Sequence, residues 1–414
     1  MQKRRVVITG LGVVAPNGVG VDNFWQANLQ GVSGTGKITR FDVALFASQT
    51  AGEVKDFNPC DYMSGLTAQR TDRFVHFGLA CAKQAIADAK IDLTQENIKR
   101  VGTIIGSGLG GVMFHEEQIL AGYQKGTHRL NPLCVPKISP NAVSAHIAMQ
   151  YNLQGINLVI STACSSGANA IGQALHAIQN NEADIVVTGG VEAPLTQFNF
   201  GAYDAMRVLS KRNDPPQGAS CPFDKRRDGF VMAEGGAMLI LEELGHALKR
   251  NASIYAELTG YACNCGANHM VIPKEDGSDA ADAMITALKY GNLKPTQISY
   301  INAHGTSTQQ NDRVETLAIK QAFGDYAYKV PISSTKSMIG HSIGASGAIE
   351  AVISCLTIKH QIIPPTINYQ QKDSICDLDY VPNQARKAKI QNVLSNSFGF
   401  GSNNACLIFG RYDG

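Results

Sequence analysis

The sequence predicts a layered α/β fold, and two observations support this prediction. Three short runs rich in β-branched residues, each followed by glycine or other small residues, are typical of strands buried on both faces: residues 6–9, 101–105 and 157–161. Between them lie segments with the apolar spacing of helices, at residues 73–89 and 144–151. Strands that alternate with helices in this way indicate βαβ units.

The second half of the chain repeats this alternation. We expect strands at 184–188, 230–242 (a pair), 253–260, 298–302 and 329–334, and helices at 278–290 and 313–323. Residues 157–178 and 330–357 share one plan, an apolar strand that enters a turn of small residues and then an Ala-rich helix. Such a repeat predicts two pseudo-equivalent halves. The charged, Pro-containing stretch 210–228 is predicted to be a long surface loop.

The composition is that of a compact α/β enzyme. Of the 414 residues, 44% are hydrophobic, 17% are charged and 41 are glycine, which excludes disorder, coiled coil and collagen and predicts many tight turns. The formal charge of +2 provides no field that would attract a polyanion. Nucleic acid is therefore not an expected partner, and an acidic protein partner would need a local basic patch.

The cysteines and the first residues of the chain indicate the cellular compartment of the protein. Ten cysteines are scattered without the spacing of a disulfide framework, which predicts reduced thiols in the cytoplasm. The first residues resemble a short signal peptide, but Gly10 and Gly12 interrupt the apolar run, so we expect a buried strand there. No run of 18 apolar residues occurs, and we expect no membrane insertion.

Two motifs suggest bound groups, but neither has the surroundings that such a site needs. The glycines of residues 106–111 match G-x-G-x-x-G, yet no acidic residue ends the next strand, so helix–sheet packing explains them better than a dinucleotide does. Cys263, Cys265 and His269 offer three zinc ligands without a second pair at metal-ligand spacing. We expect no cofactor and no metal.

Cys164 stands where a buried strand enters a helix that continues to about residue 178. The helix dipole and the free N–H groups of the first turn favour a thiolate at such a position. Taken alone, the residue is more readily explained as a buried structural cysteine in a strand-to-helix turn. As a nucleophile, it would have small neighbours that let a large electrophile approach.

Two histidines strengthen the interpretation of Cys164 as a nucleophile. His304 follows the predicted strand 298–302, and His341 lies in the turn after Lys336, so both imidazoles are placed at the carboxyl ends of strands. Sites of α/β proteins form at that edge of the sheet. One cysteine and two histidines at three such junctions indicate thioester chemistry.

Four ordered motifs make the chain similar to the β-ketoacyl-acyl carrier protein synthases, most of all to the synthase II branch. They are T-A-C-S-S-G at 162–167, N-A-H-G-T-S-T at 302–308, S-S-T-K-S-M-I-G-H at 333–341 and N-S-F-G-F-G at 396–401. The resemblance covers essentially the whole chain. It implies a thiolase fold, with two βαβαβαββ halves (residues 1–255 and 256–414) in an αβαβα five-layer sandwich, and a homodimer.

The resemblance also implies roles for the site residues. Cys164 takes the acyl group from an acyl carrier protein, and the N–H groups of Cys164 and Phe400 hold the oxyanion. His304 and His341 stabilise the enolate that forms when malonyl-acyl carrier protein loses its carboxylate. Lys336 organises the site through an ion pair with Glu350, and Phe400 acts as a gate between its flanking glycines.

Further residues are expected to contact the substrate or the carrier protein. The acyl chain and pantetheine are assigned to Leu109, Leu133, Cys134, Thr306, Thr308, Val271, Ile272 and Phe398. The basic patch for the acidic carrier is assigned to Arg70, Arg129, Arg207 and Lys211. The chain departs from the family at Val271 and Ile272, where hydroxyl residues often stand, and at Ser402 and Asn403, where Gly-Thr is usual.

Three functions remain open at this point. The first is an elongating condensing enzyme of fatty acid synthesis, with malonyl- and acyl-loaded carrier protein as substrates. The second is the same chemistry in a dedicated polyketide or aryl polyene pathway, which the departures favour. The third is a non-catalytic partner subunit such as a chain-length factor, which lacks the nucleophile that Cys164 provides here.

Overall fold

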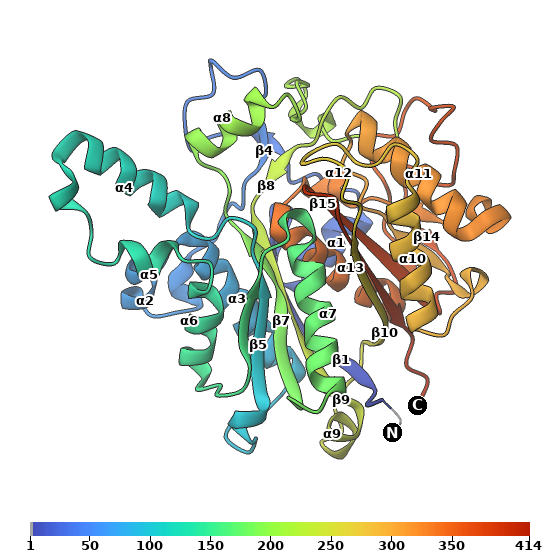
Figure 1. Ribbon diagram of the computed structural model, residues 1–414, viewed down its shortest axis with the longest axis horizontal. Coiled ribbons are helices and arrows are strands. Elements are labelled where there is room, and N and C mark those ends of the chain that lie inside the picture. Colours follow the sequence, from blue (N-terminus) through green and yellow to red (C-terminus); the bar gives the residue numbers. More distant parts are fainter. Residues whose placement is uncertain (1–2) are drawn as a thin grey trace.

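Two five-stranded sheets meet along one pair of strands in the computed structural model, which describes residues 3–414 (Figure 1). The first sheet contains β1 (Val6–Ala15), β5 (Val101–Gly106), β6 (Asn157–Ile160), β7 (Ile185–Glu192) and β9 (Gly235–Glu243). The second contains β10 (Ala256–Cys265), β11 (Tyr300–Asn302), β12 (Ile332–Ser333), β15 (Asn392–Gly399) and β16 (Asn403–Gly410). Strands β1 and β10 join the sheets through the antiparallel pairs Val7 with Glu257 and Ile8 with Ala256.

The two sheets have the same topology. The spatial order is β6-β5-β7-β9-β1 in the first and β12-β11-β15-β16-β10 in the second, so the strands of each half follow the order 3-2-4-5-1. In each half the second strand is parallel to the third and fourth, and the fifth is antiparallel to both neighbours. The predicted pair of pseudo-equivalent halves is confirmed. The predicted boundary between the two halves, at residues 255 and 256, coincides with the start of β10. That the halves are separate domains stays a prediction.

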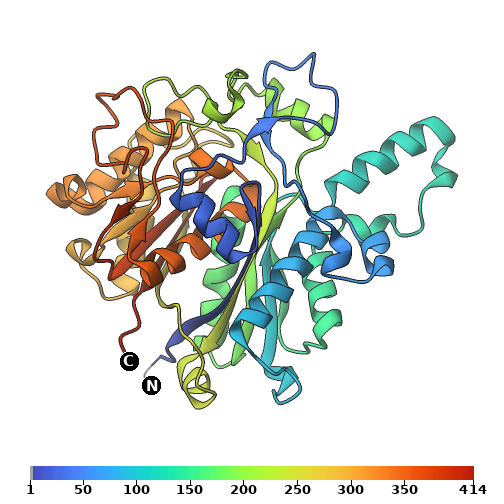
Figure 2. The ribbon, with the colours of Figure 1, turned by 180° about the vertical axis from the view of Figure 1, so that it is seen from behind.

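Helices complete five layers. Helices α7 (Ser166–Gln179) and α13 (Ser346–His360) pack against each other between the sheets. Helices α3 (Arg73–Ala89) and α6 (Ala142–Tyr151) cover the outer face of the first sheet. Helices α10 (Ser278–Tyr290) and α11 (Gln309–Phe323) cover the outer face of the second (Figures 1 and 2). None of the helices in residues 3–414 has the length and apolar character needed to cross a membrane.

Shorter elements connect these layers. They are α1 (Val21–Leu29), α2 (Gly65–Arg70), α4 (Val112–Lys125), α5 (Cys134–Ile138), α8 (Gln197–Ala205), α9 (Leu244–Lys249), α12 (Lys336–Ile339), β2 (Gly18–Val19), β3 (Gly36–Lys37), β4 (Thr50–Gly52), β8 (Met232–Ala233), β13 (Ile362–Ile363) and β14 (Arg386–Lys387). Helices α4 and α5, with the connection between them, form an arm that extends from the body of the molecule (Figure 1).

Strand β1 runs through both of its glycines, as predicted, because they lie against helix α3. A Cβ atom on Gly10 would lie 2.2 Å from the Ala85 carbonyl oxygen, and one on Gly12 would lie 2.1 Å from that of Cys81. Backbone and helix therefore approach more closely than any side chain permits.

Two sequence predictions are corrected by the packing. Strand β6 was expected to be buried on both faces, but it pairs only with β5 and forms an edge, with Leu158 44% exposed. The stretch 210–228 is not a surface loop throughout. Phe223 and Asp224 are fully buried, because the Phe223 N–H binds Asp312 and the Asp224 carboxylate pairs with Arg226.

The two central helices begin with equivalent 3-10 turns, η4 (Ala163–Ser165) and η8 (Ile343–Ala345). Ala163 (φ 51°) and Ile343 (φ 47°) both adopt the left-handed conformation. Cys164 in the first turn is thus matched by Gly344 in the second. A Cβ on Gly344 would lie 2.5 Å from Glu192 Oε2, so the second half has no room for a side chain at the equivalent place.

We expect Gly344→Ala to lower the free energy of unfolding by about 1–3 kcal/mol, because the added methyl group overpacks a buried contact. Urea denaturation measures the effect. Gly65→Ala is the control, since no atom lies within 4 Å of a Cβ there. Equal stability of the two variants would contradict the close contact at Gly344.

Candidate active site

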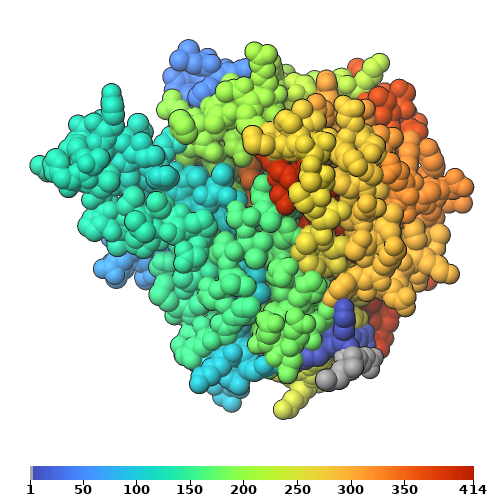
Figure 3. All heavy atoms as spheres, in the orientation of Figure 1, coloured from blue at the N-terminus to red at the C-terminus, as the bar shows by residue number. Residues whose placement is uncertain are grey.

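Loops at the carboxyl ends of β11, β12 and β15 and the 3-10 turn η4 before α7 contribute to the lining of a cavity of about 600 Å³. Its mouth is visible as a hollow in which the C-terminal segment lies between the green and yellow segments (Figure 3). Cys164, His304, His341 and Phe400 all line it. The tertiary structure therefore brings together four residues that the sequence assigned to one site.

Cys164 lies in η4, directly before α7, and is 6% exposed. Burial raises the pKa of its thiol to about 12, against the opposing effects of the Lys336 charge and of the backbone N–H groups of Phe400 and Cys164 itself. The thiolate expected from the helix start is thus not favoured, because desolvation outweighs the N–H donors and the cation. The same two N–H groups are the predicted oxyanion donors.

His304 is held by its backbone. Its N–H and that of Gly305 donate to the two carboxylate oxygens of the buried Glu315 (2.8 and 2.7 Å), and the Asn396 amide donates to the same carboxylate (3.1 Å). Among residues 3–414 the buried His304 Nδ1 has no hydrogen-bond partner. The side chain is therefore positioned by its loop and is not tied to a neighbouring acid.

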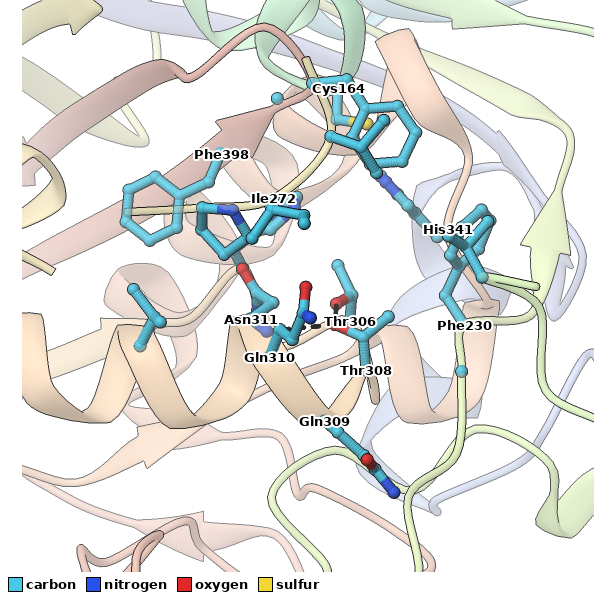
Figure 4. Close-up of a pocket in the computed structure, with 18 of the residues that line it drawn as sticks. Cys164, Phe230, Ile272, Thr306, Thr308, Gln309, Gln310, Asn311, His341 and Phe398 are labelled. Atoms are coloured by element: carbon cyan, nitrogen blue, oxygen red, sulfur yellow. Dashed lines mark hydrogen bonds between the residues drawn. The ribbon is translucent and has the colours of Figure 1, made fainter. Parts of the chain in front are cut away.

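His341 lies after α12, and its ring is perpendicular to that of His304 (88°), with centroids 5.3 Å apart. Its Nδ1 lies 2.8 Å from the hydroxyl oxygen of Ser346, the first residue of α13. A hydroxyl that donates to Nδ1 leaves the proton on Nε2. Figure 4 shows His341 and Cys164 on the wall of the cavity, with Thr306, Thr308 and Asn311 also around it.

Both imidazoles are neutral. Burial lowers the pKa of His304 and of His341 well below the usual value, and the charge of Lys336 acts in the same direction. A neutral imidazole has one N–H donor and one free acceptor. The pair can therefore hold a developing oxyanion through N–H groups, as the sequence analysis expected.

Lys336 and Glu350 form an ion pair in which both side chains are at most 3% exposed. Burial raises the pKa of Glu350 to about 7, although the Lys336 ammonium opposes this shift. The predicted pairing is confirmed. The Lys336 carbonyl also accepts a hydrogen bond from Ser220 (2.8 Å), which ties the stretch 210–228 to the site.

Phe400 follows β15, and the preceding Gly399 lies against the nucleophile turn. A Cβ on Gly399 would lie 2.8 Å from the Thr162 carbonyl oxygen and 3.2 Å from the Cys164 nitrogen, so only glycine lets the two segments approach. The Phe400 ring stacks on Tyr203, with centroids 6.4 Å apart and planes inclined by 20°.

The predicted substrate residues divide into two groups. Five line the cavity: Thr306, Thr308, Val271, Ile272 and Phe398. Three do not: Leu109, whose N–H binds Glu192, and Leu133 and Cys134, which lie where α5 begins. The part of these three residues in holding an acyl chain stays a prediction.

The predicted basic patch is spread over several elements. Arg207 lines the mouth of the cavity, and Lys211 is exposed on the stretch that follows. Arg70 ends α2, and Arg129 lies in the 3-10 helix η3 (Thr127–Arg129) of the arm. Only Arg207 of the four lies at the cavity.

Several residues of the site were not indicated by any sequence pattern. The cavity is also lined by Tyr203, Met206, Phe230, Gln309, Gln310 and Asn311. Glu315 was missed as well, although its position on the helical face of 313–323 toward the strand could have indicated it. Tyr203 and Phe230 belong to no motif, and only their packing reveals them.

The structure shows no metal site in the region it describes. No group of three His, Cys, Asp or Glu side chains in residues 3–414 is arranged to hold an ion. Cys263 and Cys265 are exposed.

We expect Lys336→Ala to lower the free energy of unfolding by about 3–5 kcal/mol at neutral pH, because it leaves the Glu350 carboxylate buried without its partner. The loss relative to the wild type should grow from about pH 7 to about pH 9, because Glu350 titrates at about 7 in the folded wild type and its pKa rises further in the variant, which lacks the Lys336 ammonium that opposes the effect of burial. A carboxyl whose pKa is raised in the folded state destabilises that state once the unfolded form ionises.

Urea denaturation over this pH range measures the effect. Arg411→Ala is the control, since it removes one partner of an exposed ion pair with Asp413 and should cost at most about 1 kcal/mol. Equal losses in the two variants would contradict the structural importance of the buried pair.

Comparison with known proteins agrees with this geometry. The chain matches the β-ketoacyl synthase N-terminal domain over residues 3–247 and the C-terminal domain over residues 255–370. It is 47% identical over 412 residues to a 3-oxoacyl-acyl-carrier-protein synthase 2 of Synechocystis sp., covering 100% of this chain and 99% of the relative. It is 46% identical over 411 residues to the protein of that name in Coxiella burnetii, covering 99% of each.

A solved structure has the same fold over the full length of both chains. It is described as a type II PKS acyl-carrier protein in complex with its ketosynthase bound to the hexaketide, with a TM-score of 0.92, 38% identity and 100% of each chain covered. Family match, identity over the whole chain and shared fold agree. The chain belongs to the β-ketoacyl synthase family.

Proposed function

We propose that this chain elongates an acyl chain by two carbons through decarboxylative condensation with malonyl-acyl carrier protein, giving 3-oxoacyl-acyl carrier protein. One observation carries the proposal: a cysteine at a helix start and two neutral imidazoles face one cavity. The relatives named 3-oxoacyl-acyl-carrier-protein synthase 2 support it.

In the first step Cys164 sulfur attacks the carbonyl carbon of an acyl thioester on the carrier protein. The tetrahedral oxyanion accepts hydrogen bonds from the N–H groups of Cys164 and Phe400. The carbon–sulfur bond to the carrier then breaks, and the carrier thiolate takes the proton that Cys164 gave up.

In the second step malonyl-acyl carrier protein loses its carboxylate as carbon dioxide. The electron pair of the broken carbon–carbon bond forms the enolate. The enolate oxygen accepts hydrogen bonds from the N–H groups of His304 and His341. The enolate carbon attacks the acyl group on Cys164 and the product leaves. The thiolate that remains on Cys164 then takes up a proton.

A second candidate is the same chemistry on polyketide chains. The similarity to a ketosynthase of a type II polyketide system supports it, and so do the apolar Val271 and Ile272 at the cavity. Turnover on acyl carriers of graded chain length, compared with oxygenated chains, distinguishes the two. Saturated chains are expected to be the better substrates of an elongating enzyme of fatty acid synthesis.

We place the protein in the cytoplasm, where its ten unpaired cysteines would stay reduced. We further propose a homodimer in which edge strand β6 and the arm form the interface. Leu158 on β6 and Ile119, Leu120, Tyr123 and Val135 on the arm are exposed. Leu133 and Cys134 would then act from the arm, across the interface.

We expect Cys164→Ala to abolish acylation and condensation and to leave the fold intact, because it removes the nucleophile and little buried volume. Mass spectrometry after incubation with acyl carrier protein, together with a condensation assay, measures both. Cys81→Ala is the matched control, since it removes another buried thiol, one that does not line the cavity. Condensation by Cys164→Ala would refute the assignment, and so would a wild-type enzyme that gains no acyl mass.

For His304→Ala and His341→Ala we expect acylation of Cys164 to persist and malonyl decarboxylation to fall about 10²–10³-fold per lost donor. The physical reason is that both N–H groups are assigned to the enolate oxygen and not to the thiol. Release of labelled carbon dioxide and the mass of the acyl-enzyme report the two steps separately. Loss of acylation with normal decarboxylation would reverse the roles.

The homodimer predicts a mass about twice 44.3 kDa in light scattering. Leu158→Asp should shift it toward the single chain, because it places a charge in the proposed interface. Leu45→Asp is the control, since Leu45 is 98% exposed on another part of the surface. A monomeric wild-type protein, or equal behaviour of the two variants, would argue against this interface.

A further inference from the structure

A row of aromatic rings connects the predicted gate to the two histidines. The Phe400 ring stacks on Tyr203, and Tyr203 meets Phe230 edge to face, with centroids 6.0 Å apart and planes at 84°. Phe230 packs in the same way on His341 (5.3 Å, 75°), whose ring is perpendicular to that of His304. Within this row, Tyr203 is the ring on which the Phe400 ring stacks.

Tyr203 belongs to a helix that hydrogen bonds hold in place. It lies in helix α8, whose N-terminus is capped by the Thr196 hydroxyl, which accepts the Asn199 N–H (3.2 Å). The neighbouring Asp204 carboxylate accepts the N–H groups of Ala47 and Ser48 (3.1 and 2.9 Å). The helix is thus tied at both ends, and its aromatic side chain has a defined place at the cavity.

Phe400, by contrast, is carried by a turn. Gly401 (φ 79°) and Ser402 (φ 59°) both adopt the left-handed conformation. The turn is held by the Gly401 N–H, which donates to the Met270 carbonyl (2.7 Å), and by the Asn403 amide, which donates to the Phe400 carbonyl (3.2 Å). These bonds hold the backbone of the turn, so the ring of Phe400 is positioned by what it packs against.

We propose that Tyr203 is a positioning residue that holds the Phe400 ring closed beside Cys164 until an acyl group displaces it. The proposal rests on the proposed function, in which acylation must precede malonyl decarboxylation. An offset aromatic stack biases a two-state position by about 2- to 10-fold. Loss of the stack should therefore let the gate open before Cys164 is loaded.

The test compares Tyr203→Leu, which removes the ring, with Tyr203→Phe, which keeps it. The first readout is the alkylation rate of Cys164 by iodoacetamide without carrier protein, followed by mass spectrometry. The second is malonyl decarboxylation without acyl primer, relative to condensation. We expect Tyr203→Leu to raise both values about 2- to 10-fold and Tyr203→Phe to restore both to those of the wild type.

The double variant Tyr203→Leu/Phe400→Ala shows whether Tyr203 acts through the gate. If it does, Phe400→Ala alone raises both readouts, and adding Tyr203→Leu causes no further increase. A change of thiol acidity by Tyr203→Leu would instead persist in the Phe400→Ala background. Thermal unfolding of each variant checks that the fold is retained.

The proposal is overturned if Tyr203→Leu leaves both readouts unchanged, if Tyr203→Phe behaves like Tyr203→Leu, or if the effects of the two substitutions multiply in the double variant. Failure of the proposed function has a different signature. In that case the wild-type enzyme gains no acyl mass on Cys164, while the alkylation rates still report whether Tyr203 positions Phe400.

Discussion

The close contact between the N-termini of the two central helices is the constraint on which the site depends. A Cβ on Gly167 of α7 would lie 2.9 Å from the Gly344 carbonyl oxygen and 3.0 Å from the Ala348 nitrogen. Small residues at both helix starts therefore let the two halves meet without an intervening side chain. Cys164 lies in the turn directly before α7, and Ser346, which contacts His341, is the first residue of α13, so this contact also brings Cys164 and His341 to one cavity.

Burial determines the resting chemistry of the cavity. Removal from water raises the pKa of the Cys164 thiol and lowers the pKa of both histidines, so these three groups are all uncharged. The charges that remain nearby are balanced by fixed partners, as Glu315 is by two backbone N–H groups and Lys336 is by Glu350. Charge is then stabilised only where the reaction creates it, at donors that are already in place.

The two halves share a topology, but the equivalent turns before α7 and α13 have different roles. The Glu192 carboxylate accepts hydrogen bonds from the N–H groups of Gly108 and Leu109 in the first half and of Gly344 in the second. These bonds hold the turn before α13 against the first half. The first turn keeps the same left-handed entry and carries Cys164, the proposed nucleophile. At equivalent positions, the duplicated fold thus has the Cys164 thiol in one half and a glycine that binds the Glu192 carboxylate in the other.

The sequence by itself determined the alternation of strands and helices, the repeat, and the placement of Cys164, His304 and His341 at the ends of strands, because each of these depends on residues that are neighbours in the chain. Four contiguous motifs were enough to indicate the family and its chemistry. Only the tertiary structure decided that β6 is an edge, that residues 223 and 224 are buried, and that Tyr203 and Phe230 wall the cavity. It also decided the protonation of the site, where the helix start alone suggested a thiolate. Exposure, ring packing and desolvation are set by atoms from distant segments, and no local pattern of residues encodes them.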